Sequence, residues 1–147
     1  MAEHDDEEFL DRFESCTIPF SEWKHRAHLK VAYLYLRRFS LDEAVAKMRA
    51  GLKALNEVHG SPESLDRGYH ETLTVAWMRL VHLTLAQYGP AESSEQFLER
   101  QPELTNRYAL RFFYSRDRIM SWEAKREFVE PDLAPLPQPA GDRQSGG

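Results

Sequence analysis

The stretch YHETLTVAWMRLVHLTLAQY, residues 69–88, decides the fold. Beyond its first turn it carries a single formal charge, at Arg79, and apolar side chains cover most of its circumference at helical spacing. A helix that is apolar on nearly all sides is buried by neighbouring elements. We therefore predict a central helix over about residues 69–88, ended by Gly89 and Pro90.

The segments around this helix also have helical patterns. Ser40 and Glu43 form a capping box that opens a helix ending at Gly60. Before it, Ser21 caps a helix that runs to about Phe39. The other predicted helices cover about residues 6–15, a short segment capped by Ser93 and Gln96, residues 103–114 and a short segment from Ser121.

Proline and glycine positions favour an all-α fold. The prolines before residue 130 fall between the helical segments, and no hairpin dipeptide or alternating apolar pattern marks a strand. We predict one compact bundle of about five to seven helices over residues 1–130. Residues 131–147, which begin PDLAPLPQPA, are expected to form an extended Pro-rich tail whose last residues are disordered.

Composition limits the class of protein. The chain has 147 residues, of which 41% are hydrophobic and 29% charged, as in one soluble globular domain. Its single cysteine, Cys16, excludes an intramolecular disulfide and any multi-cysteine zinc motif. No apolar run approaches the roughly 20 residues that span a bilayer, and the N-terminus is acidic. We therefore expect a cytoplasmic protein that does not associate with membranes.

Charge is unevenly distributed along the chain. The net charge is −5, and seven of the first 15 residues are acidic against one base, Arg12. Such a chain has no general attraction to a phosphate backbone, so we expect no nucleic-acid partner. The acidic N-terminus and the Pro-rich tail are instead two segments through which a protein partner could bind. A non-catalytic protein-binding or regulatory module is therefore the alternative interpretation of function.

Two histidines are the unusual feature of the second predicted helix. His25 and His28 lie one turn apart and fall inside its apolar face. Imidazoles at this spacing can converge on one ion or one substrate group, and burying them requires a partner for each ring. The alternative is that each imidazole bonds a backbone carbonyl or a carboxylate in the core.

The first turn of the central helix collects polar groups at one end of an apolar rod. It reads Tyr69, His70, Glu71, Thr72. Free N–H groups and a positive partial charge at a helix N-terminus favour an anion or an ionised carboxylate. The alternative is that His70 only caps the helix and Glu71 only complements its dipole.

Together these residues predict a pocket between the second and central helices. His25, His28 and His70 are the predicted ligands of a divalent transition metal such as zinc or iron. Without a metal, the same histidines and Glu71 are the predicted catalytic groups of an acid–base enzyme. No complete metal motif is present, because the helical HExxH is missing and Glu22 with His25 supplies only one Glu-x-x-His pair.

A second polar cluster follows two phenylalanines near residue 114. Arginines beside aromatic rings suit the recognition of carboxylate or phosphate groups. We expect Arg116 to bind a small anionic substrate, with Tyr114 and Tyr69 as further substrate-binding residues. The alternative is a solvated loop between helices in which arginine pairs with aspartate.

Overall fold

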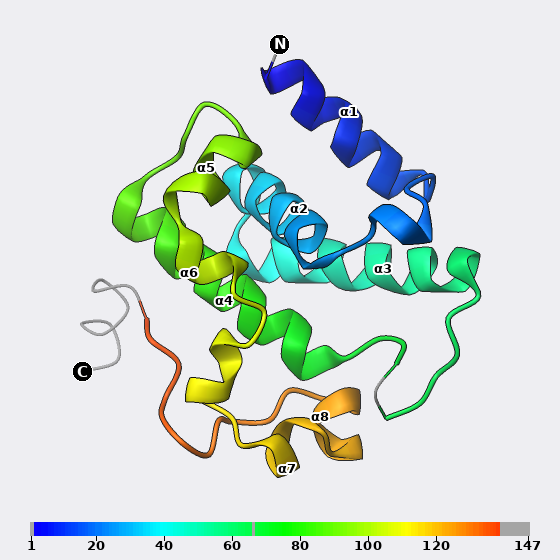
Figure 1. The fold of residues 1–147 in the computed structure, drawn as a ribbon, viewed down its shortest axis with the longest axis vertical. Coiled ribbons are helices and arrows are strands. Elements are labelled where there is room, and N and C mark those ends of the chain that lie inside the picture. Colours follow the sequence, from blue (N-terminus) through cyan, green and yellow to red (C-terminus); the bar gives the residue numbers. More distant parts are fainter. Residues whose placement is uncertain (1, 66, 139–147) are drawn as a thin grey trace.

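The computed structural model describes residues 2–65 and 67–138 (Figure 1). Within them the chain is helical and contains no strand, apart from one isolated bridge between Ser64 and Arg67, so the all-α prediction is confirmed. The elements are α1 (Ala2–Glu14), η1 (Phe20–Glu22), α2 (His25–Arg38), α3 (Leu41–His59), α4 (Glu71–Tyr88), α5 (Ser94–Arg100), α6 (Pro102–Thr105), η2 (Ala109–Phe112), α7 (Arg116–Ile119) and α8 (Trp122–Arg126).

Helix α4 is the central element of the bundle. It packs against α2, α3 and α8, and Figure 1 shows it crossing the molecule between α2 and α3 on one side and the α7–α8 segment on the other. Its inner side chains include Ala76 and Val81, both 0% exposed. The prediction of a buried central helix is therefore confirmed. The helix begins at Glu71 because His70 adopts an extended backbone and serves as the N-cap.

The predicted caps of the other helices are also present. The Ser40 hydroxyl accepts a hydrogen bond from the Glu43 amide at the start of α3. Gly60 ends that helix with φ of 68°, a left-handed conformation that glycine adopts without steric penalty. Ser93 and Ser121 cap α5 and α8 in the same way as Ser40 caps α3.

Helix α2 begins at His25 with Lys24 as its N-cap, three residues later than the cap predicted at Ser21. The ring of Trp23 stacks on that of Phe13 of α1, with centroids 5.2 Å apart, and also contacts His28 at 4.3 Å. This packing places Trp23 between two elements, and the backbone before α2 forms the short turn η1 in place of a first helical turn. Tertiary contacts of an aromatic ring therefore override the local capping signal.

The helix predicted over residues 103–114 is divided into α6 and η2. The side-chain oxygen of Asn106 accepts a hydrogen bond from the Tyr108 amide at 3.1 Å. An asparagine that bonds the backbone two residues later competes with helical hydrogen bonding, which explains the break.

The described part of the C-terminal tail packs on the bundle. Residues 131–138 form neither helix nor strand, and the Leu133 amide donates to the Phe113 carbonyl at 2.9 Å. Both carboxylate oxygens of Asp132 accept hydrogen bonds from Ser115, and Leu136 is 8% exposed within the core cluster. The expectation of disorder at the end of the tail falls on residues 139–147, which lie outside the described residues. Among the helices described, none is both long enough and apolar enough to cross a bilayer.

Gly51 of α3 lies directly against the ring of Phe13 of α1. A Cβ atom at this position would lie 2.3 Å from Cε2 of Phe13, whose ring is 0% exposed and is held by Trp23 and Tyr35. We expect Gly51→Ala to lower the free energy of unfolding by about 1–2 kcal/mol, because overpacking of about 1–3 kcal/mol exceeds a gain in helix propensity of about 1 kcal/mol. Urea denaturation measures the change.

Ala54→Gly, at an exposed position of the same helix, isolates the propensity effect. A Gly51→Ala protein more stable than the wild type would contradict the packing described for Phe13.

Candidate functional site

An open groove of about 630 Å³ lies beside the N-terminal end of α4. Its walls come from α3, from the first residues of α4 and the loop before it, and from α8 with the two residues that follow it. Of the described residues that line it, four are basic and three are acidic, and three are aromatic. The groove is therefore a mixed polar and aromatic surface with a small excess of positive charge.

Glu71 is at the centre of a tight polar cluster in the groove. Its two carboxylate oxygens accept hydrogen bonds from Nε and Nη2 of Arg49 at 2.9 and 2.6 Å, a bidentate ion pair. The Tyr69 hydroxyl donates to the same carboxylate at 2.5 Å. The hydrogen bonds from Arg49 hold the pKa of Glu71 below its usual range, while burial and the Glu71 carboxylate raise the pKa of Tyr69. At neutral pH the carboxylate is ionised and the phenol keeps its proton.

Lys125 anchors the opposite side of the cluster. Its side chain is only 5% exposed, and Nζ donates to the carbonyls of Arg67 and Tyr69 at 2.6 and 2.7 Å. The carboxylate of Glu63 lies 3.2 Å from the same nitrogen. A buried ammonium with three acceptors is well satisfied, so Lys125 holds α8 against the loop that precedes α4.

Two further cations of the groove form no close ion pair within the described part of the chain. Lys53 and Arg126 are both exposed, and neither forms an ion pair with a described residue. The ammonium of Lys53 lies 5.0 Å from the centre of the Tyr69 ring. These two side chains, one from α3 and one from α8, are therefore available to an external anion.

Two aromatic side chains add an apolar surface to the groove. Trp122 is 49% exposed, although large aromatic side chains are usually mostly buried. Phe128 is half-buried, and the guanidinium of Arg79 lies 4.5 Å from its ring centre. An exposed tryptophan in a concave site is typical of ligand contact surfaces.

The structure places Tyr69 and Glu71 in this groove and gives their neighbour His70 a structural role. As N-cap of α4, His70 accepts the Leu73 amide at Nδ1, at 3.1 Å. Its Nε2 donates to the Ile119 carbonyl at 2.8 Å, and burial lowers its pKa. Both ring nitrogens are thus occupied, in agreement with the capping alternative for this residue.

His25 faces the central helix but does not reach its N-terminal end. Its ring lies edge-on to Trp77 with centroids 4.5 Å apart, so α2 and α4 do face each other. Trp77 is about two turns along α4 from His70. The Nε2 atom of His25 donates to the Leu104 carbonyl at 2.9 Å, and burial lowers the pKa of the ring.

His28 contacts a different part of the fold. Its Nδ1 donates to the Lys24 carbonyl at 3.0 Å, and its ring packs against Trp23. Burial lowers the pKa of His28 to about 4. The two histidines of α2 therefore bond separate backbone carbonyls and do not converge on one point.

These positions bear directly on the predicted metal site. Among the side chains that the structure describes, no three histidine, cysteine, aspartate or glutamate groups are arranged to hold a metal ion. His25, His28 and His70 each give one ring nitrogen to a backbone carbonyl and lie against different elements. A zinc or iron site built from them therefore has no support in the geometry, and neither has a pocket that joins them to Glu71.

Tyr114 and Arg116, which we predicted to bind a substrate together, have different surroundings in the structure. Tyr114 is 1% exposed and its hydroxyl donates to the Val129 carbonyl at 2.7 Å, so it is a core residue; burial raises its pKa to about 12. Arg116 is exposed at the start of α7 and does not line the groove. The alternative interpretation of this segment as a surface connection fits both residues better than a substrate site does.

Sequence reasoning missed the contribution of α3 and α8 to the groove. Arg49 and Lys53 are four residues apart on α3, a helix to which we assigned no functional residue. That spacing places both side chains on one side of the helix, and it was the feature of the sequence that could have indicated a shared site. Nothing in the local pattern indicated that Trp122 and Lys125 would lie beside them, because this contact joins segments more than 50 residues apart.

The acidic N-terminal helix uses three of its carboxylates within the fold, including Glu7, which lies 4.0 Å from Nη2 of Arg38. Both oxygens of Asp6 accept hydrogen bonds from Ser94, from its amide at 2.8 Å and its hydroxyl at 2.6 Å. Glu14 accepts the Tyr35 hydroxyl at 2.8 Å. Binding of a basic protein partner by the remaining acids of α1 stays a prediction.

The lowered pKa of His28 predicts a pH dependence of stability. As pH falls, the unfolded chain takes up the proton first, near pH 6.5, while the folded ring stays neutral to about pH 4. The stabilisation is therefore complete above pH 6.5 and is lost as pH falls from about 6.5 to about 4. We expect the melting temperature of His28→Gln to fall less than that of the wild type between pH 7 and pH 5. Parallel curves for the two proteins would contradict the burial of His28.

Comparison of the chain with protein-family models, with curated proteins and with solved structures found no match. The distinctive features of the groove are the fixed Arg49–Glu71 pair, the exposed cations Lys53 and Arg126, and the exposed ring of Trp122.

Proposed function

We propose that the protein binds a small organic anion in the groove beside the N-terminus of α4. The observation that carries this proposal is that Lys53 and Arg126 line one groove, are both exposed and form no ion pair with a described residue. A charged head group placed there replaces water around both cations and gains hydrogen bonds from each. A carboxylate or a phosphate meets this requirement.

The remaining side chains of the groove favour a ligand with an aromatic or apolar body. Trp122 and Phe128 offer ring faces, and a groove of about 630 Å³ lies within the usual range of about 300–1,000 Å³ for small-molecule sites. The ion pair of Arg49 with Glu71 fixes both side chains before a ligand arrives. A preorganised wall reduces the entropy lost on binding.

Binding is favoured over acid–base catalysis by the protonation states in the groove. Glu71 is held ionised by Arg49, which makes it a poor proton donor and a weak base. The histidines that we expected to act with it bond backbone carbonyls elsewhere. The groove thus supports a ligand-binding or sensing role more strongly than a catalytic one.

Isothermal titration calorimetry with phenyl phosphate tests the proposal. We expect a Kd of about 0.1 mM, as is usual for a ligand of this size. The double substitution Lys53→Ala with Arg126→Ala should weaken binding at least about tenfold, because both contacts to the charged head group are lost.

Lys47→Ala provides the matched control. Lys47 lies on the same helix as Lys53, but its ammonium packs over the Phe39 ring at 4.5 Å, outside the groove. Phenol, which lacks the charge, should bind more weakly than phenyl phosphate. The absence of binding heat in the wild type, or equal affinity in the double variant, would refute the proposal.

A further inference from the structure

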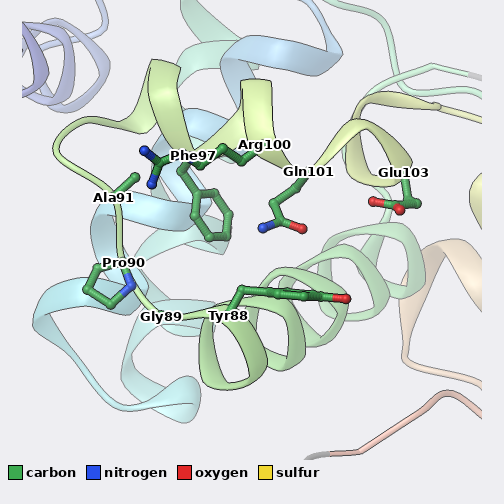
Figure 2. Close-up of a pocket in the computed structure, with 8 residues that line it drawn as sticks. All are labelled: Tyr88, Gly89, Pro90, Ala91, Phe97, Arg100, Gln101 and Glu103. Carbon is green, nitrogen blue, oxygen red and sulfur yellow. The ribbon is translucent and has the colours of Figure 1, made fainter.

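A second pocket, of about 350 Å³, lies at the other end of α4 (Figure 2). It is formed by Tyr88 at the end of the helix, by the segment 89–91 and by residues of α5 and α6 with the residue between them, Gln101. It shares no lining residue with the groove. The pocket is therefore a separate site from the proposed anion-binding groove.

Gln101 is the unusual residue of this pocket. It is only 7% exposed, and its backbone amide and carbonyl are used by Leu98 and Leu104. Its side-chain amide has no hydrogen-bond partner among the described residues. Figure 2 shows this amide directed across the pocket toward the side chain of Tyr88. The side chain is mostly buried, but its amide borders the open pocket, where its two donors and its acceptor are available to a ligand.

The walls around this amide are rigid. Phe97 is 1% exposed and stacks on Tyr33, with ring centroids 4.4 Å apart. The Tyr33 hydroxyl in turn donates to the Ala91 carbonyl at 3.2 Å and accepts the Ala91 amide at 3.1 Å. Two buried rings and a pair of hydrogen bonds thus fix the segment that borders the pocket. A preformed wall of this kind is typical of ligand sites.

The remaining side chains indicate the chemistry of the occupant. Tyr88 is 64% exposed and contributes a flat aromatic face. The two charged lining residues, Arg100 and Glu103, have opposite signs, so the pocket carries no net charge. These features favour a neutral, flat molecule over an ion.

We propose that this pocket binds a neutral aromatic molecule that carries a carboxamide or lactam edge. The N–H of that edge donates to Oε1 of Gln101, and its carbonyl oxygen accepts from Nε2, a paired contact that matches the two ends of the glutamine amide. The ring of the ligand packs against Tyr88. Neither anion binding in the groove nor any residue of the groove is involved.

Titration with benzamide, followed in ¹H–¹⁵N spectra of the full chain, tests this inference. We expect signals of Gly89, Ala91 and the Gln101 side chain to shift with a Kd of about 1 mM, a usual affinity for a fragment of this size. N,N-dimethylbenzamide, which has no N–H, and acetamide, which has no ring, should each bind at least several-fold more weakly. Gln101→Met should weaken benzamide binding about tenfold, and Gln87→Met, an exposed change on α4 outside the pocket, should not.

Tyr88→Ala is the second variant, and it keeps the test valid if Gln101→Met perturbs folding. Because Tyr88 is exposed, its removal should leave the melting temperature nearly unchanged and still weaken benzamide several-fold. The inference is overturned if benzamide shifts none of these signals, if dimethylation of its nitrogen does not weaken it, or if neither variant reduces its affinity.

Discussion

Thr72→Val should lower the free energy of unfolding by about 3 kcal/mol. Thr72 is 0% exposed, and its hydroxyl donates to the Glu127 carbonyl at 2.9 Å and accepts the Val129 amide at 3.1 Å. Valine has nearly the same shape but no hydroxyl, so two backbone groups lose their partner at about 1–3 kcal/mol each. Urea denaturation of both proteins measures the difference.

Two control variants test whether the effect comes from the bridge that the Thr72 hydroxyl forms between α4 and residues 127–129. Thr72→Ser keeps the hydroxyl and should lose only about 1 kcal/mol for the missing methyl group. Thr84→Val, on the same helix, removes a hydroxyl that bonds only the Leu80 carbonyl of its own helix, and should change stability by less than about 1 kcal/mol. Equal effects of Thr72→Val and Thr84→Val would show that the bridge contributes nothing.

Lys125→Met should also lower the free energy of unfolding by about 3 kcal/mol. The substitution keeps most of the buried apolar stem but removes the ammonium that three acceptors surround. The carbonyls of Arg67 and Tyr69 then lose a charged donor, which is more damaging than the loss of a neutral hydrogen bond. Because the loop before α4 forms one wall of the groove, phenyl phosphate should bind this variant more weakly as well.

Arg126→Met is the control one residue away. Arg126 is exposed and forms no ion pair with a described residue, so the change should alter stability by no more than about 0.5 kcal/mol. It should nevertheless weaken phenyl phosphate binding, because Arg126 is one of the two cations assigned to the ligand. If Lys125→Met is no less stable than Arg126→Met, the anchoring role of Lys125 is refuted.

The helices that depend on local signals were predictable from the sequence. The capping box of Ser40 with Glu43 and the left-handed Gly60 define α3 in both the prediction and the structure. The nearly uncharged run after Glu71 likewise identified the buried helix. In these cases the residues that decide the structure lie within one or two turns of each other.

Boundaries that depend on distant partners were not predictable in the same way. The start of α2 is set by the contacts of Trp23 with Phe13 and His28, and no local pattern reveals them. The break between α6 and η2 had a local cause in Asn106, which the apolar periodicity of the segment concealed.

The candidate site residues likewise divide into those indicated by local sequence and those whose partners are distant in sequence. Tyr69 and Glu71 were identified because polar residues at the end of an apolar helix stand out in the sequence. The grouping of His25 and His28 with His70 was expected from shared apolar faces, but a helical face indicates burial and not the partner that satisfies the ring. Backbone carbonyls, which every segment supplies, satisfy all three.

The positions of the tryptophans provide the most direct test of the groove as the binding site. Trp122 lines it, whereas Trp23 packs between α1 and α2 and Trp77 lies against His25. The measurement is a ¹H–¹⁵N titration of the three indole N–H signals with phenyl phosphate. The account predicts that the Trp122 signal shifts in a saturable manner while the other two remain in place, and that the shift disappears in the Lys53→Ala, Arg126→Ala protein. A saturable shift of Trp23 or Trp77 with Trp122 unchanged, or no shift at all, would contradict it.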